Sequence, residues 1–341
     1  MNPVTLIGID LGKHHFHLHA QDRTGRMVFR KKLTRSQLLT QLGNFPACTV
    51  VMEACAGAHW IARQVASLGH QAKLISPHFV KPFRQGNKTD FADAQAICEA
   101  ASRPSMRFVH PHTEAQQTLS ALHRVREALV RDRTGTINQV HGFLLEFGIS
   151  LPKGPAILQR LPTVLAQHPD LPPQVIALLE RLHTHCKYLD EQIRQFEREL
   201  TQQLTEDDRS RRLLTIPGIG PITASALTLE LSNAGQFATA RYFAASLGLV
   251  PRQYSTGGKP TLLGISKRGG KNVRRLLVQC ARALMQTIHR RTDALGHWVQ
   301  ALRARRHSNV VACALANKLA RIAWAILAKG IPYQPRQLSS T

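Results

Sequence analysis

Two short apolar runs near the start of the chain each end in an acidic residue, and they constrain what the first third can fold into. LIGID ends in Asp10, and TVVME ends in Glu53. Short runs rich in Val and Ile are typical of buried strands. Two further acids, Asp90 and Asp93, stand three residues apart, which puts both side chains on one face of a helix. Because buried carboxylates need a partner, we expect cations where these four acids lie.

The residues up to about 110 alternate between predicted strands and helices. Three strands come first, and helices then alternate with the later strands, which describes a mixed α/β sheet. This order of elements matches a ribonuclease-H-like fold. We predict strands at 4–9, 15–20, 26–32, 48–52 and 72–75, and helices at 36–42, 58–68 and 90–101.

The middle of the chain is predicted to be helical. An apolar stripe over 119–144 indicates one long amphipathic helix, which Gly148 closes, and the Pro-rich stretch 151–173 should turn the chain. A second stripe over 182–200 has the heptad spacing of a coiled coil. Both stripes fit a paired-helix arm, formed either as a hairpin within one chain or as a seam between two chains.

The last part is predicted to be mainly helical, so three domains are expected: 1–112, 113–206 and 207–341. It opens with LLTIPGIGPITASAL, which resembles the hairpin of a helix-hairpin-helix motif. Gly218 and Gly220 would allow the tight turn, and the helix that follows would present backbone N–H groups to a phosphate. A Gly-rich connection between two helices is the structural alternative.

A segment rich in hydroxyls, glycines and cations follows at YSTGGK. Ser255 and Thr256 precede two glycines and Lys259, and a basic cluster comes next. A hydroxyl among cations could attack a phosphodiester, because the cations stabilise the charge that develops in the transition state. On its own the segment indicates only phosphate binding. The basic cluster consists of Lys267, Arg268, Lys271, Arg274 and Arg275.

The charge of the chain points to a polyanionic partner. Lys and Arg number 45 against 21 acids, for a formal net charge of +24, and after Arg252 the single acid is Asp293. Such an excess favours nucleic acid as the partner, with a generic solvated basic face as the alternative.

Cysteine usage and hydropathy indicate a soluble protein of a reducing compartment. The six cysteines lie far apart, with no zinc-ligand spacing, and are expected as reduced thiols of the cytosol. No signal stretch is present, and no apolar run reaches the ~20 residues that span a bilayer. Residues 312–328 are interrupted by polar and basic side chains and are expected as a core helix. No membrane association is predicted.

The four acids suit a pair of Mg²⁺ or Mn²⁺ ions, because three or four carboxylates on rigid elements can hold two such ions beside a phosphodiester. The purely structural alternative is that Asp90 caps its helix and Asp10 ends a turn. GIDLGK also resembles the phosphate-binding turn of actin-like kinases and ATPases, which need a second such domain. The run His14, His15, Phe16, His17, Leu18, His19 is assigned no metal, because on a strand its histidines are expected to divide between the two faces.

Taken together, these motifs resemble the bridge-RNA-guided transposases of bacterial insertion sequences. The family is the one numbered one hundred and ten, and GISKRG resembles its eleven-eleven subgroup. The resemblance covers almost the whole chain. It is carried by GIDLGK, VMEACAGAHW, GNKTDFADAQAI, RDRTGTINQVHGFLLEFGI, IPGIGPITASAL and SLGLVPRQYSTGGKPTLLGISKRGGKNVRRLL.

The resemblance implies an amino-terminal RuvC-like domain with a DEDD metal site, a coiled-coil arm and a carboxy-terminal domain that supplies a serine nucleophile. The DEDD positions fall on Asp10, Glu53, Asp90 and Asp93. Family members recombine donor and target double-stranded DNA with a structured non-coding RNA as guide. The family serine directly precedes a glycine, whereas here Thr256 does. We assign Ser255, whose primary hydroxyl is less hindered, and keep Thr256 as its rival.

The remaining expectations concern binding residues, assembly and competing functions. A homodimer or homotetramer is expected, in the bacterial cytoplasm near the nucleoid, and the family resemblance implies an active site shared between subunits. A hydrolytic RuvC-like endonuclease or junction resolvase, and a non-catalytic nucleic-acid-binding protein, are the alternatives. The residues assigned to nucleic-acid binding are Lys13, Lys88, Gly218, Gly220, Arg252, Lys259, Lys267, Arg268, Lys271, Arg274 and Arg275.

Overall fold

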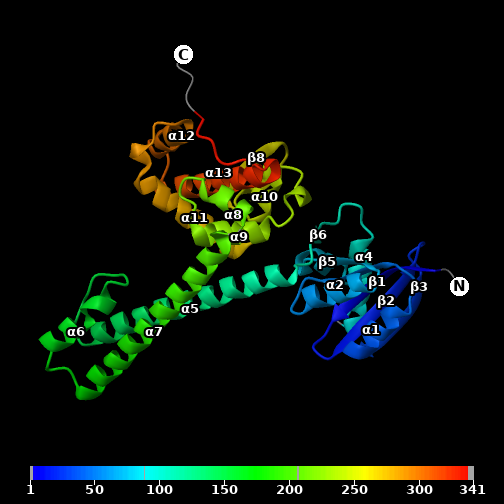
Figure 1. Ribbon diagram of the computed structural model, residues 1–341, viewed down its shortest axis with the longest axis horizontal. Helices are drawn as coiled ribbons and strands as arrows, with labels where there is room; N and C mark the ends of the chain where they lie inside the picture. Colours follow the sequence, from blue (N-terminus) through cyan, green and yellow to red (C-terminus); the bar gives the residue numbers. More distant parts are fainter. Residues whose placement is uncertain (1–2, 88, 206, 337–341) are drawn as a thin grey trace, which may run out of the picture. The chain divides into compact units, whose positions relative to one another are not determined.

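The computed structural model describes residues 3–87, 89–205 and 207–336, so Lys88 lies outside the described residues. The chain forms two compact units, Met1–Thr118 and Leu119–Thr341 (Figure 1). The first unit corresponds closely to the predicted α/β domain. The second contains both the predicted arm and the predicted carboxy-terminal domain.

The first unit is built on a six-stranded mixed sheet with the strand order β3-β2-β1-β4-β5-β6. The first three strands pair antiparallel, β4 and β5 run parallel to β1, and β6 closes the far edge antiparallel. This arrangement is consistent with the expected ribonuclease-H-like fold. The strands are β1 Val4–Leu11, β2 His15–Asp22, β3 Met27–Thr34, β4 Thr49–Glu53, β5 Gln71–Ile75 and β6 Phe108–Val109.

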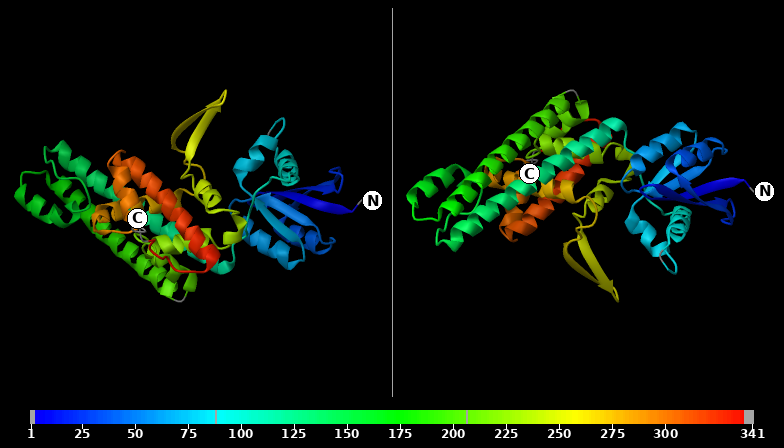
Figure 2. Two further views of the ribbon diagram at one scale, coloured as in Figure 1. Left: turned by 90° about the horizontal axis from the view of Figure 1, so that it is seen from above. Right: turned by 90° about the horizontal axis from the view of Figure 1, so that it is seen from below.

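Helices cover both faces of the sheet because its central strands are apolar on both sides. Val50 and Met52 of β4 pack in one core with α1 (Arg35–Gly43) and α2 (Ala58–Ser67). Val51, between them, packs in the other core with α4 (Asp90–Ala101). Figure 2 shows α4 on the opposite face from α1 and α2. The predicted strands and helices of this unit are thus confirmed, and the short helices α3 (Pro77–Val80) and η1 (Lys81–Phe83) were not predicted.

The arm of the second unit consists of α5 (Glu114–Glu146), α6 (Ile157–Gln167) and α7 (Pro173–Thr205). Its core joins α5 residues such as Val140 to α7 residues such as Cys186, and ion pairs such as Arg133–Asp190 flank it. Along the predicted heptad stripe, Cys186, Leu189 and Ile193 are at most 5% exposed within the single chain. The stripe is therefore used in an intramolecular hairpin and is not left open as a dimer seam. The Pro-rich stretch turns the chain but also contains α6, which was not predicted.

The remainder of the second unit is a helical body with one protruding β-hairpin. Its core surrounds α13 (Ser308–Lys329), where Val311, Leu315 and Leu319 are fully buried. Among the described residues, α13 is the one helix long and apolar enough to cross a membrane, but it packs here as the expected core helix. The helices are α8 Asp208–Leu214, α9 Pro221–Glu230, η2 Ala234–Gln236, α10 Ala240–Ser246, α11 Lys271–Gln286, η3 Ile288–Arg290, α12 Ala294–Arg303 and α13 Ser308–Lys329.

The hairpin consists of β7 (Pro251–Thr256) and β8 (Lys259–Ile265), which pair antiparallel. It projects from the helical body, and almost every residue in it is exposed (Figure 2). All six cysteines of the chain are free, as expected for reduced thiols.

Candidate active site

The four predicted acids come together at one edge of the sheet in the first unit. Asp10 lies near the carboxyl end of β1, and Glu53 is the last residue of β4. Because β1 and β4 are adjacent and parallel, their carboxyl ends meet at the same edge. Asp90 and Asp93 occupy the first turn of α4, on the face of the sheet that α4 covers. The structure therefore gathers the quartet that the sequence predicted.

Close packing of α4 on β1 brings the acids of the helix to the strand. A Cβ atom at Gly8 would lie 2.5 Å from the carbonyl oxygen of Ala94 and 2.7 Å from Sγ of Cys98. Only glycine permits this approach of helix and strand. The cap of α4 is Thr89, whose hydroxyl accepts a hydrogen bond from the backbone N–H of Ala92. Asp90 is thus not the cap, which leaves its carboxylate free for another role.

Crowding of negative charge is strongest at Asp10. Burial raises the pKa of its carboxyl group to about 6, and the charges of Asp93, Asp90 and Glu53 add to the rise, whereas His17 opposes it. A carboxylate in this position favours a proton or a cation beside it. The acids therefore form one electrostatic unit, which a divalent cation would relieve.

Arg84 already supplies one positive charge to this site, and the sequence analysis missed it. Its Nη2 lies 3.1 Å from Oε1 of Glu53, and its Nε lies 2.8 Å from Oδ1 of Asp93. Oδ1 of Asp93 is buried and makes no aligned hydrogen bond with any described residue, and its contact with Arg84 is an ion pair. Arg84 lies between η1 and α4, in a loop without a periodic pattern, so this contact could not be predicted from the sequence.

His17 also lies beside these acids, and the histidines of β2 share one face, whereas we expected the run to divide between two faces. Residues 15, 17 and 19 alternate along β2 and so share one face, which α4 covers at His17 and His19. His17 is the register partner of Asp10, and its Nδ1 lies 3.5 Å from Oδ2 of Asp90. His19 hydrogen-bonds with Gln21 and Arg30, and burial lowers its pKa to about 4, so it is a neutral core residue.

The residues at this edge fit a divalent cation. One ligand atom each from Asp10, His17 and Asp90 lie within 4.8 Å of one another. Carboxylate oxygens suit Mg²⁺ and Mn²⁺, and an imidazole nitrogen favours Mn²⁺ over Mg²⁺. Glu53 and Asp93 provide further carboxylates at the same edge.

The hydroxyls predicted as nucleophiles lie on the β7–β8 hairpin of the second unit. Gly257 and Gly258 both have positive φ, 56° and 77°, as a two-residue hairpin turn requires. Thr256 pairs with Lys259, and Ser255 pairs with Pro260. Since neighbouring residues of a strand point to opposite faces, the two candidate hydroxyls lie on opposite faces of the hairpin.

The two faces differ in chemistry. The face of Thr256 also carries Tyr254 and the cation of Lys259, by the register of the strands. On the other face, Oγ of Ser255 accepts a hydrogen bond of 2.6 Å from Nε2 of Gln253. Both hydroxyls are exposed.

Two glycine-containing loops cross at the base of the hairpin. A Cβ atom at Gly248 would lie 2.3 Å from the carbonyl oxygen of Arg268, and one at Gly269 would lie 1.8 Å from that of Ser246. Nη1 of Arg274 donates a hydrogen bond of 2.8 Å to the carbonyl oxygen of Leu247, in one of these loops. The GISKRGG motif therefore fixes the root of the hairpin, and Arg274 has a structural role there.

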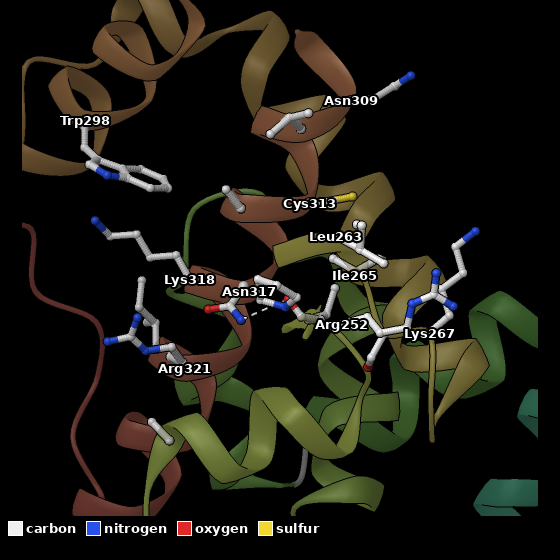
Figure 3. Close-up of a pocket in the computed structure, with 18 of the residues that line it drawn as sticks. Arg252, Leu263, Ile265, Lys267, Trp298, Asn309, Cys313, Asn317, Lys318 and Arg321 are labelled. Carbon is white, nitrogen blue, oxygen red and sulfur yellow. Dashed lines mark hydrogen bonds between the residues drawn. The ribbon is translucent and has the colours of Figure 1, made fainter. Parts of the chain in front are cut away.

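A groove of 1130 Å³ runs beside this root, between the hairpin and α13 (Figure 3). Cations come to it from both sides: Arg252 and Lys267 from the hairpin side, Lys318 and Arg321 from α13. None of the described residues that line it is acidic. Nζ of Lys318 lies 4.1 Å from the ring centroid of Trp298, and burial, followed by the charge of Arg321, lowers the pKa of Lys318. The groove suits an anionic partner, and the sequence analysis missed the cations on α13.

The other predicted nucleic-acid-binding residues are dispersed. Lys13 is exposed in the turn that follows β1, and Lys271 is exposed at the first turn of α11. Arg275 lies 3.7 Å from Glu127 of α5, and so joins the arm to the helical body. The predicted hairpin of the helix-hairpin-helix forms the turn between α8 and α9.

The two glycines of that turn have different surroundings. At Gly218, with a φ of 81°, a Cβ atom would lie 3.1 Å from Cβ of Leu284, whereas the space beside Gly220 is open. Packing against α11 therefore explains Gly218. The proposed phosphate contact of this turn stays a prediction.

Comparison with known proteins gives two family matches. A model of DEDD transposases of the IS110 type, described as "Transposase", matches residues 7–149. A second, described as "Transposase IS116/IS110/IS902 family", matches residues 210–296. The first match contains all four acids of the site, and the second contains the β7–β8 hairpin.

Curated relatives match along almost their whole length. The chain is 59% identical, over 97% of its length and 98% of the relative's, to the transposase for insertion sequence element IS1328 of Yersinia enterocolitica. It is 47% identical to a probable family 20 transposase of Pseudomonas aeruginosa, over 96% and 98% of the two chains. It is 40% identical to the transposase for insertion sequence element IS1111A of Coxiella burnetii, over 98% and 92%.

Proposed function

This chain belongs to the IS110/IS116 family of insertion-sequence transposases, which are enzymes that act on DNA, and from that premise we propose that it is an RNA-guided recombinase. It cuts and rejoins donor and target DNA through a covalent serine–DNA intermediate, with the acidic site as its metal centre. The observation that carries this proposal is the convergence of Asp10, Glu53, Asp90 and Asp93 at one edge of the sheet.

The acids would hold two divalent cations beside the scissile phosphate. When bound, such ions supply charge stabilisation to the attacking and leaving oxygens of an in-line displacement. Asp10, Asp90 and His17 would hold one ion, and Glu53 and Asp93 would contribute to the other. One of these acids would accept the proton of the nucleophile.

The hydroxyl of Ser255 is proposed as that nucleophile. Its oxygen forms a bond to the phosphorus at a DNA 5′ end, the bond from phosphorus to the 3′ oxygen breaks, and the hydroxyl proton passes to a base. The reverse step, with a different 3′ hydroxyl, joins new strands without ATP because the phosphodiester energy is conserved. Exposure of the hairpin on both faces supports its access to DNA.

Guide RNA would supply the sequence specificity that the protein surface lacks. A basic surface holds a duplex through its backbone, while base pairing between RNA and DNA reads the sequence. The net charge of +24 and the acid-free groove beside α13 support this division of labour. Strand exchange between two duplexes needs four cuts, so we propose a dimer or tetramer in the bacterial cytoplasm, with acids and nucleophile shared between subunits.

One experiment separates the possible chemistries. The full-length protein is incubated with Mg²⁺, its non-coding RNA, and donor and target duplexes, and the products are run on a denaturing gel. A protein–DNA adduct supports the recombinase. Free 5′ phosphate without an adduct would indicate a hydrolytic endonuclease or junction resolvase, and intact DNA would indicate a non-catalytic binding protein.

Two matched variants assign the nucleophile. Ser255→Ala should abolish the adduct, and Thr256→Val, which keeps the shape of threonine, should retain it. The two residues lie on opposite faces of one exposed hairpin, so neither substitution should change the melting temperature. The reverse result would transfer the nucleophile to Thr256, beside Lys259.

A further inference from the structure

The acidic site is divided into two unequal halves. In one half, the ligand atoms of Asp10, His17 and Asp90 lie within 4.8 Å of one another. In the other half, Glu53 and Asp93 are bridged by the guanidinium of Arg84, at 3.1 and 2.8 Å. A cation is therefore already in place between the second pair of carboxylates, and it belongs to the protein.

The geometry of each half has a chemical consequence. An ion that binds the half with His17 has to break one ion pair, the contact between His17 and Asp90. This contact is long, at 3.5 Å. In the other half, both carboxylates are largely buried: the side chains of Glu53 and Asp93 are 14% and 7% exposed. Arg84 contacts Oε1 of Glu53 and Oδ1 of Asp93, so a divalent ion that takes these two oxygens competes with the guanidinium for them.

The side chain of Arg84 can move into solvent. It follows η1 in a loop, and its side chain is 33% exposed, so rotation about its side-chain bonds carries the charge into water. The contact with Asp93 lacks hydrogen-bond alignment, so little geometry is lost when it breaks. A protein cation that pairs with metal ligands reduces the apparent affinity for metal to the intrinsic affinity multiplied by the fraction of time for which the ligands are free.

We propose that the two halves bind divalent ions in order: first the half formed by Asp10, His17 and Asp90, then the half that Arg84 closes. His17 is a ligand of the first ion and gives this half a preference for Mn²⁺ over Mg²⁺. Arg84 is the counter-ion of the second half and competes with the ion that binds there. This inference rests on the proposed metal centre but adds two residues outside the four acids.

The test measures metal binding without nucleic acid, so it does not depend on activity. Full-length protein freed of metal is titrated with Mn²⁺, and the free ion is followed by electron paramagnetic resonance. We expect the wild-type protein to bind one Mn²⁺ at least about tenfold more tightly than a second. Arg84→Ala should tighten the second ion by about tenfold and leave the first unchanged, whereas His17→Ala should weaken the first by about tenfold or more.

Matched controls lie in the same unit. Arg103→Ala removes an exposed arginine that pairs with Glu99 on the surface of α4, and His15→Ala removes the exposed neighbour of His17 on the same strand face. Neither should alter Mn²⁺ binding. Arg84→Lys, which keeps a positive charge, should leave the second ion weak and shows that charge, not folding, is responsible.

The outcomes distinguish this inference from the proposed function. Two ions of equal affinity in the wild-type protein, or no effect of Arg84→Ala on the second ion, would overturn the ordered binding and leave the metal centre intact. Lack of any Mn²⁺ binding in both proteins would overturn the metal centre as well. If Arg84→Ala lowers the melting temperature, Mn²⁺ should restore more of the stability of the variant than of the wild type.

Discussion

At the scale of single residues, burial and neighbouring groups together decide which carboxyl groups have shifted pKa values. Asp10 lies between strand and helix among three other carboxylates, and its pKa rises to about 6, whereas hydrogen bonding from Arg291 lowers the pKa of Asp293. The sequence located all four acids because each ends a strand or begins a helix. It did not locate Arg84, which lies in a loop whose path depends on tertiary packing. The position of His17 could have been predicted, since the two-residue period of β2 places it opposite Asp10.

Replacement of Asp10 by Asn should stabilise the metal-free protein at neutral and higher pH. A folded-state pKa of about 6, above the ordinary 3.8, means that the contribution of Asp10 to stability is present below about 3.8 and lost as the pH rises through 6. Asn carries no charge at any pH. After allowance for solvent screening, the gain should be about 1–2 kcal/mol near pH 8 and should vanish near pH 4. Urea unfolding with a chelator measures it.

The control variant, Asp293→Asn, should change the stability near pH 8 in the opposite direction. Asp293→Asn removes a carboxylate whose pKa is lowered by Arg291, so its contribution is present above the ordinary pKa and lost as the pH falls. This variant should be less stable than wild type near pH 8, and the difference should shrink in acid. An Asp10→Asn protein that is destabilised near pH 8 would contradict the account of the site.

At the scale of elements, local pattern sufficed where the whole element follows one period. Strands β1 to β5 and helices α1, α2 and α4 were predicted close to their observed bounds, whereas β6 was not predicted and the stripe over 182–200 marked only part of α7. The β7–β8 hairpin was not predicted, although two glycines between short β-prone runs, Gly257 and Gly258, are a hairpin signal. Helix α6 was missed because it contains Pro162 and lies in a Pro-rich stretch.

Truncation of the buried arm stripe should destabilise the single chain. Ile193 is 5% exposed and lies on α7 among residues that face α5. Ile193→Ala should lower the unfolding free energy by about 2–4 kcal/mol, because the cavity forms inside one chain. Leu178→Ala, on the same helix but 41% exposed, should cost far less. Thermal melting at several protein concentrations tests this, since a stripe that joined two chains would make the loss depend on concentration.

At the scale of the whole molecule, acidic and basic side chains are concentrated in different parts of the chain. Acids converge on one site in the first unit, while the carboxy-terminal stretch after Arg252 carries a single acid, Asp293, which pairs with Arg291. The total charge could be predicted from composition. The grouping of Arg252 and Lys267 with Lys318 and Arg321 could not be predicted, because about fifty residues separate the pairs. Only the packing of α13 against the hairpin root brings them together.

The cations that α13 adds to this groove should contribute directly to nucleic-acid affinity. Each phosphate contact that is lost lowers the slope of log affinity against log salt by about one, so Lys318→Gln with Arg321→Gln should reduce it by about two. The matched control is Arg194→Gln with Arg198→Gln on α7, two exposed arginines that both pair with Glu191. Fluorescence anisotropy with a labelled RNA or duplex, from about 50 to about 200 mM salt, gives the slopes. Equal slopes for the two double variants would mean that the groove binds no phosphate, and that the charge of the molecule acts only as a diffuse field.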